Sequence, residues 1–231
     1  MAKTREFQAL LDACSQEGCI VCRLTQESTH RYLDNWKYEL FTDVTLRMEL
    51  RHTRGFCHMH TWQLAAIGAS LQLAQSYREI ISDAMEQLQQ GGTGASGGGL
   101  LHRLFESKRG GNGDNECPAC RQKAKAEERY AQTLQQALTN EEFYRRFTRS
   151  QGLCLDHFRL TSELKTTDNS TEWLPLLQKA QMGCLQRLDA QLGELIRKHD
   201  YRFQDEERGQ EMVSWKRAAG LVAGEEDRIQ G

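Results

Sequence analysis

Apolar side chains recur every three or four positions over long stretches of this chain, which is the spacing of one face of an α-helix. The longest such run predicts a helix over 173–198. Its apolar stripe comprises Leu176, Leu177, Ala180, Cys184, Leu188, Leu192 and Ile196. A second run follows Cys19 and comprises Val21, Leu24, Tyr32 and Trp36.

Further helices are indicated by residues that favour helix ends. Asp43 and Asn140 carry side chains typical of a helix start. Gly55 interrupts the chain before a predicted helix over 56–67, and another helix is predicted over 71–90. No run of residues shows the convincing alternation of a strand, and only two prolines occur in the whole sequence. The predicted fold class is therefore all-α.

One cysteine pattern occurs twice. Each copy reads C-x2-C and later G-[FL]-C-x2-H, with 34 or 33 residues between the second cysteine and the third. An arginine follows the first cysteine pair in both copies, as Arg23 and Arg121. Two matched sets with the same flanking residue indicate an internal duplication.

Glycine is concentrated between the two copies, where nine of the 19 glycines fall between Gly91 and Gly113. Glycine loses more backbone entropy on ordering than any other residue, so we predict a linker over 91–115. The linker separates a first module over 1–90 from a second module over 116–203, with a tail over 204–231. We expect two tandem modules of about four helices each. Packing with pseudo-twofold symmetry is expected, since each short bundle needs a neighbour to bury its apolar face.

The duplicated cysteines and histidines have the spacing of metal ligands. Two ligands separated by two residues can turn toward one point, and two such pairs complete a tetrahedron. We therefore expect each copy to hold one metal ion. The predicted ligands are Cys19, Cys22, Cys57 and His60 in the first copy, and Cys117, Cys120, Cys154 and His157 in the second.

Zinc is the favoured metal, because three cysteines and one histidine form one of its common closed ligand sets. Two Zn²⁺ ions per chain are expected, and iron–sulfur clusters are the alternative, since histidine replaces cysteine in some of them. Cys14 precedes Cys19 at a ferredoxin-like spacing, but Asn112 occupies the same place before Cys117. Cys14 is therefore predicted to be a buried or incidental thiol, and Cys184 is predicted to pack in the core.

His58 also lies close enough to the first copy's ligands to compete with His60. The repeat decides between them, because His157 aligns with His60 while Leu155 takes the place of His58.

Composition narrows the classes of function. The formal net charge is −2 and the pI is near 6.4, which gives no general attraction to nucleic acid or anionic membranes. No apolar run is long enough to span a bilayer, and the N-terminus lacks the apolar core of a signal peptide. We expect a cytoplasmic protein whose cysteines stay reduced.

Basic residues precede the second ligand pair in each copy. They are Arg47, Arg51 and Arg54 in the first copy, and Arg145, Arg146 and Arg149 in the second. Such rows suit phosphate groups. Acidic residues lie among or just before them, however, and favour a solvated, ion-paired helix face. Nucleic acid is therefore not an expected partner.

The sequence resembles the DUF6062-type family of bacterial and archaeal proteins of unknown function. The resemblance rests on C-x2-C-R and R-G-F-C-x2-H in the first copy, and on C-P-A-C-R and G-L-C-x2-H in the second. It also rests on the tail residues 197–203 and 211–218. The resemblance implies no activity, but it supports treating the tail as part of the fold.

The ligand set favours a non-enzymatic protein. Four protein ligands leave no open position for water, and no nucleophile motif, phosphate loop or dinucleotide fingerprint is present. We predict an interaction or regulatory module with a protein partner. The alternative is electron transfer or redox sensing, by iron–sulfur clusters or by cycling dithiols. Hydrolytic chemistry at a zinc site opened by loss of His60 or His157 is the least favoured hypothesis.

Overall fold

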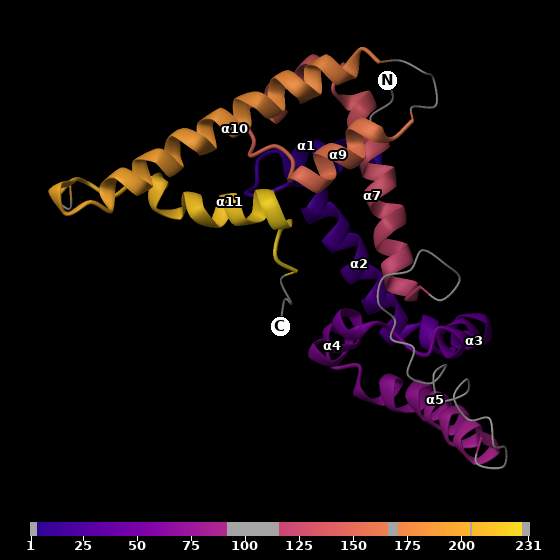
Figure 1. Cartoon of the computed structure of the whole chain (residues 1–231). Coiled ribbons are helices and arrows are strands. Elements are labelled where there is room, and N and C mark those ends of the chain that lie inside the picture. Colours follow the sequence, from indigo (N-terminus) through magenta and orange to yellow (C-terminus); the bar gives the residue numbers. More distant parts are fainter. Residues whose placement is uncertain (1–3, 92–115, 166–170, 204, 228–231) are drawn as a thin grey trace. The chain divides into compact units, whose positions relative to one another are not determined.

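The computed structural model describes residues 4–91, 116–165, 171–203 and 205–227. Within these ranges the chain forms ten α-helices and three short 3₁₀ helices, with no strand (Figure 1). The predicted all-α class is confirmed. None of the helices in the described ranges is both long and apolar enough to cross a bilayer.

The predicted linker over 91–115 lies outside the described residues, apart from Gly91, which ends a helix. The described chain divides into two compact units. The first combines Met1–Glu27 with Lys125–Asp227, and the second contains Ser28–Ala124.

Two long helices each contribute to both units. α2 (Ile20–Tyr38) supplies its beginning to the first unit and its end to the second. α7 (Pro118–Ala137) begins in the second unit and ends in the first. The units are therefore not the tandem modules expected over 1–90 and 116–203, and the tail is not separate from the first unit. Pseudo-twofold packing stays a prediction.

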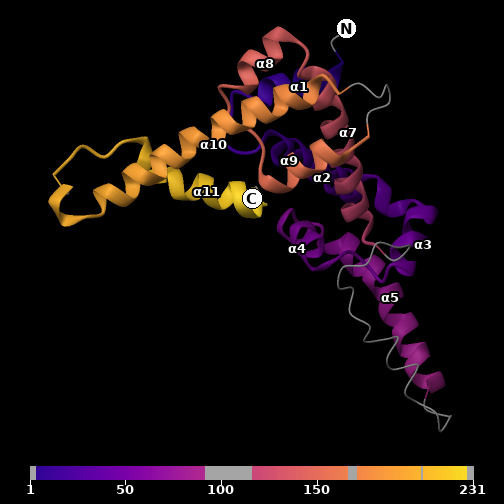
Figure 2. The ribbon, with the colours of Figure 1, turned by 45° about the horizontal axis from the view of Figure 1, so that its top comes forward.

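The first unit is built around a large apolar core. Besides parts of α2 and α7 it contains α1 (Arg5–Ala13), α8 (Glu141–Phe147), α9 (Leu155–Glu163) and α10 (Trp173–Lys198). Phe143, Phe147, Leu134 and Leu177 are fully buried in this core, as is Leu10 from α1. α1 packs against α8 (Figure 2). This core fixes the positions of the two segments that carry its cysteines and histidine.

The tail belongs to the first unit. It forms η2 (Tyr201–Phe203), η3 (Gln210–Val213) and α11 (Ser214–Ala223). Figure 1 shows α11 running beside α10, and Lys198 pairs with Glu211 at 2.8 Å. Trp215, in α11, is 55 % exposed. The tail is thus an integral layer, as the family resemblance implies.

The second unit has its own smaller core. It contains η1 (Leu40–Thr42), α3 (Val44–His52), α4 (His58–Ala66) and α5 (Ser70–Gly91), with parts of α2 and α7. Trp36 lies at its centre, and its ring meets the Phe56 ring edge-on at 5.0 Å between centroids. The basic residues of α3 face α5, where Arg47 pairs with Glu79 and Arg51 with Asp83. An ion-paired helix face is therefore observed here.

Local sequence signals set several helix ends. The Asp43 carboxylate accepts from the backbone N–H of Leu46 at 3.0 Å, and the Asn140 side chain accepts from that of Phe143 at 3.0 Å. Both residues are N-caps, as predicted. The helix predicted over 173–198 is observed at the same residues.

Candidate metal sites

Two clusters bring together all eight predicted ligand residues, but in a different combination from the one expected. The first cluster, here called site 1, contains Cys19, Cys22, Cys154 and His157, and lies in the first unit. The second, site 2, contains Cys57, His60, Cys117 and Cys120, and lies in the second unit. Each cluster combines residues of both copies, whereas each copy was expected to hold its own ion.

The exchange follows from the paths of the long helices. The C-x2-C pair of each copy stands at the start of α2 or α7, while the C-x2-H pair of each copy stands at the start of α4 or α9. The start of α2 lies in the same unit as α9, and the start of α7 in the same unit as α4. Each site therefore combines the C-x2-C pair of one copy with the C-x2-H pair of the other.

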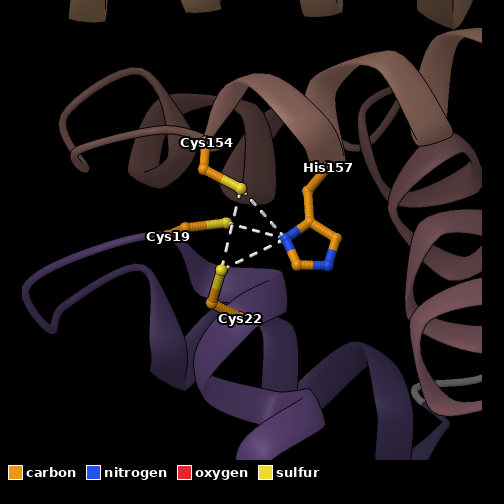
Figure 3. A group of neighbouring side chains, drawn as sticks. All are labelled: Cys19, Cys22, Cys154 and His157. Atoms are coloured by element: carbon orange, nitrogen blue, oxygen red, sulfur yellow. Dashed lines mark hydrogen bonds between the residues drawn. The ribbon is translucent and has the colours of Figure 1, made fainter. Parts of the chain in front are cut away.

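Site 1 has the dimensions of a tetrahedral metal site. The Cys22 and Cys154 sulfurs are 3.7 Å apart. The His157 Nδ1 atom lies 3.1 Å from Cys154, 3.2 Å from Cys22 and 3.6 Å from Cys19, and all three sulfurs point toward it (Figure 3). Zinc bond lengths give tetrahedral edges of about 3.8 Å between sulfurs and about 3.5 Å between sulfur and nitrogen. One ion therefore fits among the four ligand atoms.

Site 2 has nearly the same geometry. The Cys57 and Cys120 sulfurs are 3.7 Å apart. The His60 Nδ1 atom lies 3.2, 3.4 and 3.6 Å from Cys57, Cys120 and Cys117. His58 is not in the cluster, which agrees with the choice of His60 from the repeat alignment. The His58 ring instead packs edge-on near Trp62.

The sites differ in exposure. All four residues of site 1 are buried, and Cys154 is only 1 % exposed. In site 2, Cys57 and Cys120 are half-buried. Cys57 and Cys120 are therefore more accessible to reagents in solution than the thiols of site 1.

A positive-φ glycine shapes the turn before each C-x2-H pair. Gly152 has φ +77° and Gly55 has φ +92°, a left-handed conformation that favours glycine. A Cβ at Gly152 would lie 2.7 Å from the Gln181 Oε1 atom. The Gln181 side chain makes two hydrogen bonds to the turn. Its Oε1 accepts from the Leu153 N–H at 3.0 Å, and its Nε2 donates to the Leu153 carbonyl at 2.8 Å. α10 thereby holds the site 1 turn in place.

In each site the pKa of the cysteine in the C-x2-H pair is lowered. Hydrogen bonds from Cys19 and Cys22 hold the pKa of the Cys154 thiol well below its usual range. In site 2 the pKa of Cys57 is lowered in the same way by the other two thiols. Both residues are N-caps, of α9 and α4, and a helix N-terminus further favours a thiolate. The thiolate is the form that binds a metal.

The histidines hold a proton that a metal would displace. Burial lowers the pKa of His60, but its hydrogen bonds with Cys117 and Cys57 outweigh burial and raise that pKa to about 9. Burial also opposes the charged form of His157, and hydrogen bonds with Cys154 and Cys22 raise its pKa to about 11. Metal binding at either site therefore releases protons.

Two acidic residues near site 1 were not identified from the sequence. The Glu127 Oε1 atom lies 3.5 Å from His157 Nε2, whereas the sulfurs contact the other ring nitrogen, Nδ1. Such a carboxylate orients a metal-bound histidine. Glu225, from the tail, accepts from the Cys19 backbone N–H at 3.0 Å. Glu127 is far in sequence from His157, and Glu225 is far from Cys19, so only the fold brings the members of each pair together.

Two further cysteines and two arginines named in the sequence analysis lie outside the two ligand clusters. Cys14 and Cys184 are buried, as predicted, and burial raises the pKa of Cys14 to about 12. The arginines that follow the two C-x2-C pairs contact oxygen atoms of other residues. Arg23 donates to the Glu17 carbonyl, and Arg121 pairs with Glu49.

Fold and sites together define an all-α protein with two Cys₃His clusters, each able to hold a metal ion. The chain belongs to the family described as "Family of unknown function (DUF6062)", whose profile matches residues 7–228. It is 24 % identical over 221 residues to an "Uncharacterized 23.9 kDa protein in xynA 3'region" of Caldicellulosiruptor sp. (strain Rt8B.4). That match covers 93 % of this chain and 99 % of the relative. No solved structure matches the chain.

Proposed function

We propose that this chain is a non-enzymatic cytoplasmic protein in which two structural zinc ions hold a helical scaffold that acts as an interaction or regulatory module for a protein partner. The observation that supports it is the convergence of four protein side chains at each site. Four protein ligands fill a tetrahedral zinc ion and leave no position for a catalytic water.

The spacing of the ligand atoms supports a single ion rather than a cluster. Within each site all four ligand atoms lie within 4.8 Å of one another. In a cubane cluster each cysteine binds a different iron atom, so the sulfurs lie farther apart than one tetrahedral edge. Three thiolates with one imidazole are a common closed set for zinc.

A metal in these sites would tie together distant parts of the chain. In site 1 the ligands Cys22 and Cys154 are 132 positions apart in sequence. By analogy with a covalent cross-link, closing a loop of this length removes several kcal/mol of unfolded-state entropy, roughly 5 kcal/mol. A structural role for each ion is consistent with such a cross-link.

Metal analysis by mass spectrometry on protein purified without oxygen, with a visible spectrum, tests the proposal. About two zinc ions per chain and a colourless protein are expected. Cys22→Ser should reduce the content to about one, while the non-ligand control Cys14→Ser should leave it unchanged. Iron with acid-labile sulfide would contradict the proposal and move the protein to electron transfer.

One observation favours redox sensing as a second candidate. Cys57 and Cys120 are half-buried, and their sulfurs are 3.7 Å apart. Peroxide could take two electrons from these two thiolates and be reduced to water, with a disulfide formed and the zinc ion released. Zinc release from site 2 ahead of site 1 under mild peroxide would support this candidate, and equal release from both sites would count against it.

A further inference from the structure

A pocket of about 290 Å³ lies in the first unit, beside site 1. Cys19 and Cys154 form part of its wall, so the pocket adjoins site 1 directly. Its other walls come from the loop after α8, from α10 and from the tail. The proposed zinc function does not use this pocket.

The charged side chains of the pocket are mainly basic. Arg149, Arg187 and Arg217 line it, against the single carboxylate of Glu225. That carboxylate is already engaged, because it accepts from the Cys19 backbone N–H at 3.0 Å. The three arginines and Glu225 therefore carry a net positive formal charge, which suits an anion.

The guanidinium groups of two arginines are fixed against the pocket wall. Arg187 Nη2 donates to the Ser150 carbonyl at 2.9 Å and lies 3.2 Å from the Cys184 sulfur. Arg217 Nη2 donates to the Gln191 side chain. Each guanidinium has five N–H donors, so these contacts leave donors for a ligand.

The hydrogen bonding of Arg217 is incomplete. Its Nε–H is buried and has no partner among the residues that the structure describes. A buried donor without a partner costs free energy, and an unoccupied ligand position is one reason for it to persist. Small adjustments of this side chain would let an anion in the pocket satisfy it.

We propose that this pocket binds the phosphoryl group of a small soluble phosphomonoester. A phosphomonoester carries about −1.5 to −2 charges at neutral pH and three acceptor oxygens, which matches three guanidinium groups opposed by one engaged carboxylate. The pocket volume lies just below the usual range for small-molecule sites, which starts at about 300 Å³. The ligand is therefore a small phosphorylated metabolite, whose remaining polar groups face the Gln151 and Gln191 side chains.

Isothermal titration calorimetry on the zinc-loaded full chain tests this proposal, with inorganic phosphate and glycerol 2-phosphate as separate probes. We expect the phosphomonoester to bind at least as tightly as inorganic phosphate, with a Kd of about 1 mM or below. Arg187→Gln and Arg217→Gln should each weaken binding by about tenfold or more, because each removes a fork of donors. Arg145→Gln, an exposed arginine outside the pocket, is the matched control and should bind as the parent does.

Circular dichroism and zinc content accompany every variant. If Arg187→Gln or Arg217→Gln fails to fold, Arg149→Gln tests the same pocket and should also weaken binding. If neither probe binds, the proposal is overturned. Equal weakening by Arg145→Gln would also overturn it, because binding would then be general surface attraction. The proposal would likewise fail if the measured heat arose only from loss of zinc to the phosphate.

Discussion

Replacing Glu127 by glutamine should weaken zinc binding at site 1 and leave site 2 unchanged. The Glu127 carboxylate lies 3.5 Å from His157 Nε2, so it can accept the ring proton on the side away from the sulfurs. This contact fixes the tautomer that presents Nδ1 to the ion and raises the basicity of the ring. Glutamine keeps the shape of the side chain but removes the charge.

The size of the effect follows from the geometry. Loss of an orienting carboxylate costs about 10- to 100-fold in metal affinity. The contact is longer than an ordinary N–H···O hydrogen bond, and the Glu127 side chain is 26 % exposed, so solvent screens it in part. We therefore expect a loss near the lower limit, about tenfold or about 1.4 kcal/mol.

Competition with a chromophoric chelator measures this change, because the two sites release zinc in separable steps when their affinities differ. Site 2 serves as the internal control, and Glu128→Gln on the same helix, with an exposed side chain, is the matched variant. Unchanged affinity at both sites would refute the role of Glu127. An equal loss at both sites would indicate general destabilisation instead.

Three further predictions concern stability. Gly152→Ala should destabilise the first unit and lower zinc retention at site 1, because φ is +77° there; urea unfolding with zinc analysis measures both effects. Asn140→Ala should cost about 1 kcal/mol in urea unfolding, because the Phe143 N–H loses its cap, and an unchanged midpoint would contradict this. The Gly209 N–H and Lys198 hold the pKa of Glu211 at about 2, below its ordinary value of 4.5. Its contribution to stability is therefore present above pH 4.5 and lost as pH falls toward 2, and Glu211→Gln should flatten the stability–pH curve in that window.

Much of the fold follows from local sequence signals. The apolar stripe of α10 keeps one helical period over its whole length, and Pro175 falls in the first turn, where proline is tolerated, so its limits could be predicted closely. The N-caps Asp43 and Asn140 act within three residues of themselves, and local chemistry is enough to identify them. The ligand residues could be identified for the same reason, because each pair has two intervening residues.

The pairing of the ligands could not be predicted in this way. A C-x2-C pair and a C-x2-H pair make the same four-ligand set whichever copy supplies each of them. The choice depends on where α2 and α7 begin and end in three dimensions, and each of these helices contributes to both units. Glu127 and Glu225 were missed because the packing of distant segments brings them to site 1.

The exchanged pairing of ligands is the central claim, and zinc content in paired variants tests it most directly. Cys22→Ser combined with Cys154→Ser removes two ligands of one site, so about one zinc ion per chain should remain. Cys22→Ser combined with Cys57→Ser removes one ligand from each site, so the zinc content should fall toward zero. The reverse result, with zinc lost in the first pair and kept in the second, would contradict the exchange and show that each copy holds its own ion.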